Sequence, residues 1–190
     1  QIGFLDLDLN TDNRGLIFDI FIELGKSKKI NEINSQSIST LKRSNKLINN
    51  SFKKDRLISK KFIQILKSEQ NLSSILRTMK NVGVLQSYIP DFAEIVGQMQ
   101  FDLFHIFTVD EHTFKVVRNM RQMKINYSDE FRLENELIKK IPKIEILYIA
   151  GLFHDLGKGK GGNHSEIGAK ISRDFAKRLG LSLADSDLIS

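Results

Sequence analysis

The sequence predicts an all-α protein built as a helical bundle. Apolar residues recur mostly with helical spacing, and only two prolines, Pro90 and Pro142, interrupt the 190 residues. Residues 143–153, KIEILYIAGLF, are apolar on almost every side. Such a helix belongs at the centre of a bundle rather than on its surface. A short extended segment, residues 4–9, is expected before the first helix.

Four helices are predicted in the first half of the chain. They span residues 14–26, 37–48, 55–66 and 72–81. Gly25 closes the first of them, and Gly83 follows the last as a left-handed cap. Pro90 and Gly97 then bracket a break. We therefore place a domain boundary near residues 97–100, which divides the chain into 1–98 and 99–190.

Three further helices are predicted in the second half. The first begins after Thr108, because Glu111 stands three residues later and completes a capping box. This places His112 in the first turn after the cap. The buried stripe of this helix is expected at Val109, Val116, Val117 and Met120. The apolar helix 143–153 follows, and a last helix runs from residue 165 or 166 to 179 and ends at Gly180.

The composition excludes several classes of protein. The chain has no cysteine, so neither a disulfide framework nor a thiolate zinc site is possible. The longest apolar run, residues 146–153, is far shorter than the roughly 20 residues that a membrane span requires. The first residues lack the basic start and apolar core of a signal peptide. We expect a cytoplasmic protein without a membrane partner, and a piece of something longer.

Positive charge is concentrated in the first half of the chain. The net charge is +6, and residues 25–80 contain 14 basic and three acidic side chains. Such a pattern is typical of solvated helix faces, and it also fits a surface for an acidic partner. Aromatic residues do not interleave with these cations as base-stacking platforms would, so nucleic-acid binding is not expected.

Histidines occur only between residues 105 and 164. The four are His105, His112, His154 and His164, and Asp155 follows His154 directly. A charged pair at the end of a buried helix needs a partner, and a metal ion satisfies both residues. With His112 supplied by another helix, three protein ligands would leave coordination positions open for water and substrate. This pattern favours a catalytic metal site over a structural one.

The loop after Asp155 has the composition of an anion-binding loop. Lys158 and Lys160 alternate with glycines at positions 157, 159, 161 and 162. Glycines allow backbone N–H groups to approach an anion closely, and the lysines supply countercharge. The alternative is a flexible connection between two helices.

The pattern of His112 followed by His154-Asp155 resembles the HD superfamily of metal-dependent phosphohydrolases, whose pattern is H…HD…D. More narrowly, GQMQFDLFHIFTVDEHT and LFHDLGKGKGGNHSEIGA are similar to the bifunctional uridylyltransferase/uridylyl-removing enzymes that modify the nitrogen-regulatory PII protein. The similarity extends back through LRTMKNVGVLQSYIPDF and covers most of the chain.

This resemblance implies an HD-domain-like bundle and a role for each matching residue. His112, His154 and Asp155 match metal-ligand positions, for Mn²⁺ or Mg²⁺. Asp155, Lys158 and His164 are then the candidate catalytic residues, with Lys158 on phosphate and His164 at a second metal or at the substrate phosphate. His105 also matches a family position but receives no role. The implied activity is hydrolysis of the uridylyl-tyrosine phosphodiester on PII, which releases UMP.

The sequence also departs from the family pattern. The final aspartate ligand is expected beyond Ser190, because Asp174, Asp185 and Asp187 look like surface positions. The nucleotidyltransferase domain and the ACT domains that sense glutamine are not found. The resemblance thus makes residues 1–98 a connecting region after a missing nucleotidyltransferase domain, and residues 99–190 the first, truncated part of an HD domain. Such a fragment is expected to be inactive or weakly active alone.

Two other functions remain open from the residues. The chain could be an HD hydrolase for another nucleotide, such as a cyclic dinucleotide or an alarmone. It could also be a non-catalytic helical interaction module that docks an acidic partner through the basic region 25–80.

Overall fold

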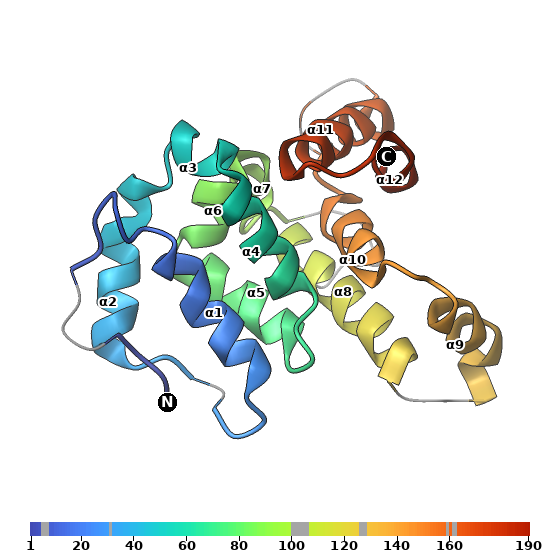
Figure 1. Ribbon diagram of the computed structural model, residues 1–190. Helices are drawn as coiled ribbons and strands as arrows, with labels where there is room; N and C mark the ends of the chain where they lie inside the picture. Colours follow the sequence, from blue (N-terminus) through green and yellow to red (C-terminus); the bar gives the residue numbers. More distant parts are fainter. Residues whose placement is uncertain (5–7, 31, 100–106, 126–128, 159, 161–162) are drawn as a thin grey trace. The chain divides into compact units, whose positions relative to one another are not determined.

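The computed structural model describes residues 1–190 except 5–7, 31, 100–106, 126–128, 159 and 161–162 (Figure 1). The described residues form helices and no β-strand, which confirms the all-α prediction. Their only β-pairing consists of two isolated bridges, between Ile2 and Ile33 and between Met99 and Thr108. Within this part of the chain, no helix combines the length and apolar character that a bilayer crossing needs.

The contacts divide the chain into two compact units. The first comprises Gln1–Ala93 and Arg178–Gly180, and the second comprises Glu94–Lys177 and Leu181–Ser190. The assignment of residues 1–98 to a connecting region and of residues 99–190 to part of an HD domain remains a prediction.

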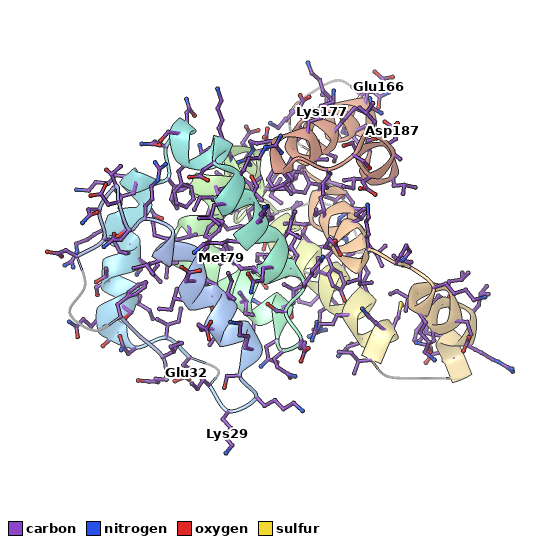
Figure 2. The ribbon with its side chains drawn as sticks, viewed as in Figure 1. Lys29, Glu32, Met79, Glu166, Lys177 and Asp187 are labelled. Carbon is purple, nitrogen blue, oxygen red and sulfur yellow. The ribbon has the colours of Figure 1, made fainter. Side chains whose placement is uncertain are left out.

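The first unit contains short helices around an aromatic core. They are α1 (Leu16–Lys26), α2 (Ser35–Ser44), the 3₁₀ turn η1 (Asn45–Leu47), α3 (Asn50–Lys54), α4 (Arg56–Leu66), α5 (Leu72–Asn81), α6 (Val84–Tyr88) and the start of α7 (Pro90–Ile95). Helix α1 packs against α4 and α5 (Figure 1). Figure 2 shows Met79 of α5 inside this unit, where it is fully buried, and Lys29 and Glu32 on its surface.

Four rings form the centre of this core. Phe18 lies edge-on to Phe52 and to Tyr88, with ring centroids 5.4 and 5.0 Å apart, and Phe62 lies 5.0 Å from Tyr88. Edge-on pairs of this kind add to the stabilisation that burial provides. Arg178 stacks over the ring of Tyr88, with its guanidinium carbon 4.5 Å from the ring centroid.

The ends of the helices in this unit follow the local sequence. Asn34, Asn49 and Asp55 each accept a backbone N–H at the start of a helix. Helix α5 ends at Asn81 as predicted, and Gly83 adopts a φ of 83°. The predicted break between Pro90 and Gly97 is wrong, because Pro90–Ile95 form α7. Proline suits the first position of a helix, where its missing N–H would have no partner in any case.

The second unit is organised around α10 (Ile144–Phe153). It also contains α8 (Val109–Ile125), the 3₁₀ turn η2 (Asp129–Phe131), α9 (Arg132–Lys139), α11 (His164–Leu179) and α12 (Leu183–Ile189). Helix α10 packs against α8 and α12, and Phe153 lies 4.5 Å from Phe175 of α11 between ring centroids. The apolar character of residues 143–153 thus correctly predicts a helix that is covered by several others.

Candidate metal centre

One packed seam between α8 and α10 brings two histidines together. Gly151 of α10 faces Val116 and Met120 of α8, and a Cβ added at Gly151 would lie 2.8 Å from the Met120 sulfur. His112 precedes Val116 by four residues, and His154 follows Gly151 by three, so each histidine continues its side of the seam. The imidazole centroids of His112 and His154 consequently lie 5.3 Å apart.

The carboxylate of Asp155 lies between the two imidazoles. Its Oδ2 is 3.2 Å from Nε2 of His154 and 3.8 Å from Nε2 of His112. The ligand atoms of these three residues all lie within 4.8 Å of one another. Asp155 is buried, whereas each histidine side chain keeps a third of its surface exposed. The group is therefore open to solvent on the histidine side and closed behind the carboxylate.

The backbone of α10 fixes the orientation of the His154 ring. Nδ1 of His154 lies 2.8 Å from the carbonyl oxygen of Gly151, one turn earlier in the helix. When Nδ1 carries the proton, it donates to that carbonyl and leaves the lone pair on Nε2, which faces Asp155. Ligating histidines are commonly oriented by such a second hydrogen bond.

A turn after α10 places a lysine on the same carboxylate oxygen. The backbone N–H of Lys158 donates to the carbonyl of Asp155 over 3.0 Å, and the Lys158 ammonium lies 2.9 Å from Asp155 Oδ2. Burial alone would raise the pKa of Asp155, but the hydrogen bonds from His154 and Lys158 outweigh it and lower this pKa to about 2. Burial acts to lower the pKa of His154, and hydrogen bonds with Asp155 and Gly151 raise it overall. Asp155 is thus held ionised.

The low pKa of Asp155 predicts a loss of stability in acid. Because the folded pKa is about 2, below the ordinary 3.8, the ionised carboxylate adds stability that is present above about pH 4 and disappears toward pH 2. This contribution amounts to about 2 kcal/mol. In metal-free protein, the gap in unfolding free energy between wild type and Asp155→Asn should therefore shrink by about 2 kcal/mol as the pH falls over this window. A gap that stays constant would contradict the assignment.

Two family models match the chain, one for each half. The model described as "Uridylyltransferase GlnD third domain" matches residues 1–88, and that of the HD domain matches residues 109–190. The chain is 41% identical, over 174 residues, to a bifunctional uridylyltransferase/uridylyl-removing enzyme of Ectopseudomonas mendocina. The enzymes of the same name from Azotobacter vinelandii and Pseudomonas aeruginosa are 40% identical over 174 residues and 38% over 175. The chain therefore contains a region of the GlnD third-domain family followed by a region of the HD-domain family, and it is similar to these enzymes over most of its length.

These alignments cover most of the chain but little of each uridylyltransferase/uridylyl-removing enzyme. They include 91% of the chain for the first two relatives and 92% for the third, and 19% of each relative. The chain therefore spans about a fifth of the length of these relatives. All three residues of the candidate centre lie within the HD-domain match.

The donor atoms suit a divalent cation, as the HD domain implies. Two imidazole nitrogens and one ionised carboxylate form a common ligand set for such ions. Ligands that bind one ion at about 2.0–2.2 Å lie no more than about 4.4 Å apart. The two separations from Asp155 Oδ2, 3.2 and 3.8 Å, are within this limit. His112, His154 and Asp155 therefore form a candidate divalent-metal site.

His164 lies beside this group without joining it. It is the first residue of α11 and is exposed, and the metal-ligand group found among the described residues does not include it. The backbone of His164 packs directly against Gly157, because a Cβ added at Gly157 would lie 2.0 Å from the His164 carbonyl oxygen. Gly157 is buried, so the turn after Asp155 supports the start of α11 directly.

The described part of the glycine-lysine loop consists of Gly157, Lys158 and Lys160. Gly159, Gly161 and Gly162 lie outside the described residues, as does His105. The Lys160 ammonium pairs with Glu94 at 3.0 Å, so the expected countercharge for a substrate anion has an acidic partner of its own. Lys158 is the loop cation that contacts the candidate metal site.

The expectation that Asp185 is a surface residue is wrong. Asp174 and Asp187 are exposed, but Asp185 is buried at the start of α12, and its carboxylate accepts a hydrogen bond of 2.6 Å from Lys143. This bond from Lys143 is the main cause of a lowered Asp185 pKa. Ser182 caps the same helix by accepting the Asp185 N–H. Asp185 therefore ties α12 to the residue that precedes α10.

Gly151 shapes the site but was not predicted from the sequence. Its carbonyl orients His154, and its lack of a side chain lets Met120 approach α10. The available signal was a single glycine within an otherwise bulky apolar helix, which often marks a close approach of another helix.

Proposed function

We propose that the second unit hydrolyses the uridylyl-tyrosine phosphodiester of the PII signal protein and releases UMP, with Mn²⁺ or Mg²⁺ as cofactor. The observation that carries this proposal is the convergence of His112, His154 and Asp155 within 4.8 Å inside the HD-domain match. Similarity to these enzymes supports the substrate, since the relatives are named uridylyl-removing enzymes. In the reaction, the bond between phosphorus and the tyrosine oxygen breaks, a bond from phosphorus to a water oxygen forms, and the tyrosine oxygen takes up a proton.

The proposed ligands are the two Nε2 atoms of His112 and His154 and the carboxylate of Asp155. A divalent cation held there supplies Lewis acidity, which activates water and neutralises phosphoryl oxygens. The Gly151 carbonyl keeps the lone pair of His154 directed at the site, because it occupies Nδ1. Burial of Asp155 keeps bulk water away from the carboxylate, so the anion interacts strongly with any cation beside it.

The substrate side of the site is assigned to Lys158 and His164. Lys158 is half-buried and adjoins the metal ligands, so its ammonium can interact with a nonbridging phosphoryl oxygen. His164, exposed at the first turn of α11, is proposed to contact the substrate phosphate from the other side of the turn. Asp155, Lys158 and His164 are thus the proposed catalytic group.

The remaining parts of the proposal concern the whole protein. Residues 1–98 would connect a preceding nucleotidyltransferase domain to the HD domain, and glutamine sensing would reside in domains outside this chain. The match of residues 1–88 to a uridylyltransferase domain family supports this position in the order of domains. A cytoplasmic location agrees with a PII substrate.

A substrate panel tests the proposal in the intact natural protein. With Mn²⁺ present, uridylylated PII, a cyclic dinucleotide and a guanosine tetraphosphate-type alarmone would each be offered at equal concentration. We expect release of UMP from uridylylated PII and negligible hydrolysis of the other two, because the family is named for uridylyl removal. Rapid cleavage of another nucleotide with PII left intact would replace this function with that of a different HD hydrolase.

A further inference from the structure

Three nitrogen groups, one cationic and two able to bind a metal, lie close to one oxygen atom. Oδ2 of Asp155 lies 2.9 Å from the Lys158 ammonium, 3.2 Å from His154 Nε2 and 3.8 Å from His112 Nε2. The lysine therefore contacts the same carboxylate oxygen that faces both imidazoles. A cation bound by the two imidazoles and Asp155 would lie beside the Lys158 ammonium.

Local backbone geometry makes the lysine contact an intrinsic feature of the motif. Lys158 follows Asp155 by three residues, and the Lys158 N–H donates to the Asp155 carbonyl over 3.0 Å. This turn returns the lysine side chain to the carboxylate that precedes it. Asp155 is buried and only 27% of the Lys158 side chain is exposed, so the ammonium neutralises a largely buried negative charge.

We propose that Lys158 is an exchangeable counter-ion, which neutralises Asp155 in the metal-free protein and is displaced toward the substrate when a divalent cation binds. The inference rests on the proposed function, because it takes His112, His154 and Asp155 as the metal ligands. It adds that Lys158 opposes metal binding and supports hydrolysis. A lysine suits this exchange because its ammonium is a compact charge on a flexible stem.

The two effects of Lys158 have opposite signs. A fixed positive charge next to a divalent cation weakens the binding of that cation, so removing the charge should tighten it. The same charge stabilises the anionic phosphoryl oxygens of the substrate, so removing it should slow hydrolysis. If Lys158 only supported the fold of the site, its removal would lower metal affinity and activity together.

Binding of Mn²⁺, followed by the electron paramagnetic resonance signal of the free ion, tests the proposal in the intact natural protein. The difference in bound Mn²⁺ between wild type and His154→Ala is assigned to this site, because any other Mn²⁺ site remains in that variant. We expect Lys158→Gln to bind Mn²⁺ at this site about tenfold more tightly than wild type, and Lys158→Arg to bind within about threefold of wild type.

Lys160→Gln is the matched control. It removes the same charge two residues away, from a lysine that pairs with Glu94 at 3.0 Å. Its Mn²⁺ affinity should change by less than about twofold, because this charge is paired with Glu94 rather than with Asp155 and interactions between charges weaken with distance. A similar gain in Lys160→Gln and Lys158→Gln would show a general charge effect and would overturn the proposal.

Two outcomes separate this inference from the proposed function. If Lys158→Gln binds Mn²⁺ with unchanged or weaker affinity while wild type releases UMP from uridylylated PII, the exchange is wrong and the hydrolase assignment stands. If Lys158→Gln binds Mn²⁺ more tightly while wild type releases no UMP, the counter-ion role stands and the substrate assignment is wrong. Tighter binding with slower UMP release is the result that supports both.

Discussion

UMP release from uridylylated PII should fall by more than about 100-fold when Asp155 is replaced by asparagine in the intact protein. Loss of a residue that merely orients a metal ligand commonly costs about 10–100-fold. Asp155 is expected to cost more, because its Oδ2 faces both imidazoles at 3.2 and 3.8 Å and asparagine carries no charge. His154→Ala should have an effect of the same size. Initial rates at saturating Mn²⁺ provide the measurement.

Asp187→Asn is the matched control for this variant. It makes the same chemical change on α12, where Asp187 is exposed (Figure 2) and pairs with Arg173 at 3.4 Å. Its rate should stay within about twofold of wild type, since exposed ion pairs contribute little. Undiminished UMP release in both Asp155→Asn and His154→Ala, with the helical circular dichroism unchanged, would remove the metal role of this pair.

The second large effect is expected at Gly157. A Cβ at this position would lie 2.0 Å from the His164 carbonyl oxygen and 2.9 Å from the Gly168 nitrogen. Both neighbours are backbone atoms of α11, so no side chain can turn aside to relieve the contact. Gly157→Ala should therefore move the start of α11 away from the turn that holds Asp155 and Lys158. We expect a loss of about 1–3 kcal/mol in stability and at least a tenfold loss in UMP release.

Gly168→Ala on α11 provides the comparison. A Cβ at Gly168 meets Gly157 only at 3.7 Å and beyond, which is ordinary van der Waals contact. Alanine is also favoured over glycine inside a helix by about 1 kcal/mol. Thermal melts should show Gly168→Ala at or above wild type and Gly157→Ala several degrees below it. Equal melting temperatures for Gly157→Ala and wild type would mean that this turn does not support α11.

Helical periodicity predicted the longer helices of the fold and missed the short ones. Helices α1, α4, α5, α10 and α11 lie close to their expected positions because each carries a clear apolar pattern or a glycine at its end. Helix α3 has five residues, too few to establish a period. Helix α9 was also missed, although Leu133 and Leu137 recur with helical spacing; in the structure they are exposed at 67% and 53%, and the buried residues of the helix include Asn135. An apolar stripe on such a helix does not mark its buried side.

The members of the candidate metal site could be predicted from sequence, but its contacts could not. His154 and Asp155 could be predicted as ligands because they follow an apolar helix. The capping box places His112 in the first turn of another helix. Their convergence depends on where α8 crosses α10, which Gly151 and Met120 determine through their close contact. The sharing of Asp155 Oδ2 with Lys158 depends on the turn geometry after α10.

In the glycine-lysine loop, too, the sequence did not predict what each single residue contacts. Lys158 and Lys160 look equivalent in sequence, yet one contacts Asp155 and the other Glu94. Gly157 looked like a residue needed for backbone approach to an anion, and it instead provides space for the backbone of His164. Composition indicates that a loop can approach a phosphate, but the structure is needed to tell its lysines apart.

Anomalous scattering from crystals of the intact protein grown with Mn²⁺ would show directly whether His112, His154 and Asp155 bind one divalent cation. We predict an anomalous peak at about 2.0–2.2 Å from both Nε2 atoms and from a carboxylate oxygen of Asp155. Well-ordered density for these three side chains with no anomalous peak between them, at Mn²⁺ concentrations that support UMP release, would contradict this ligand assignment.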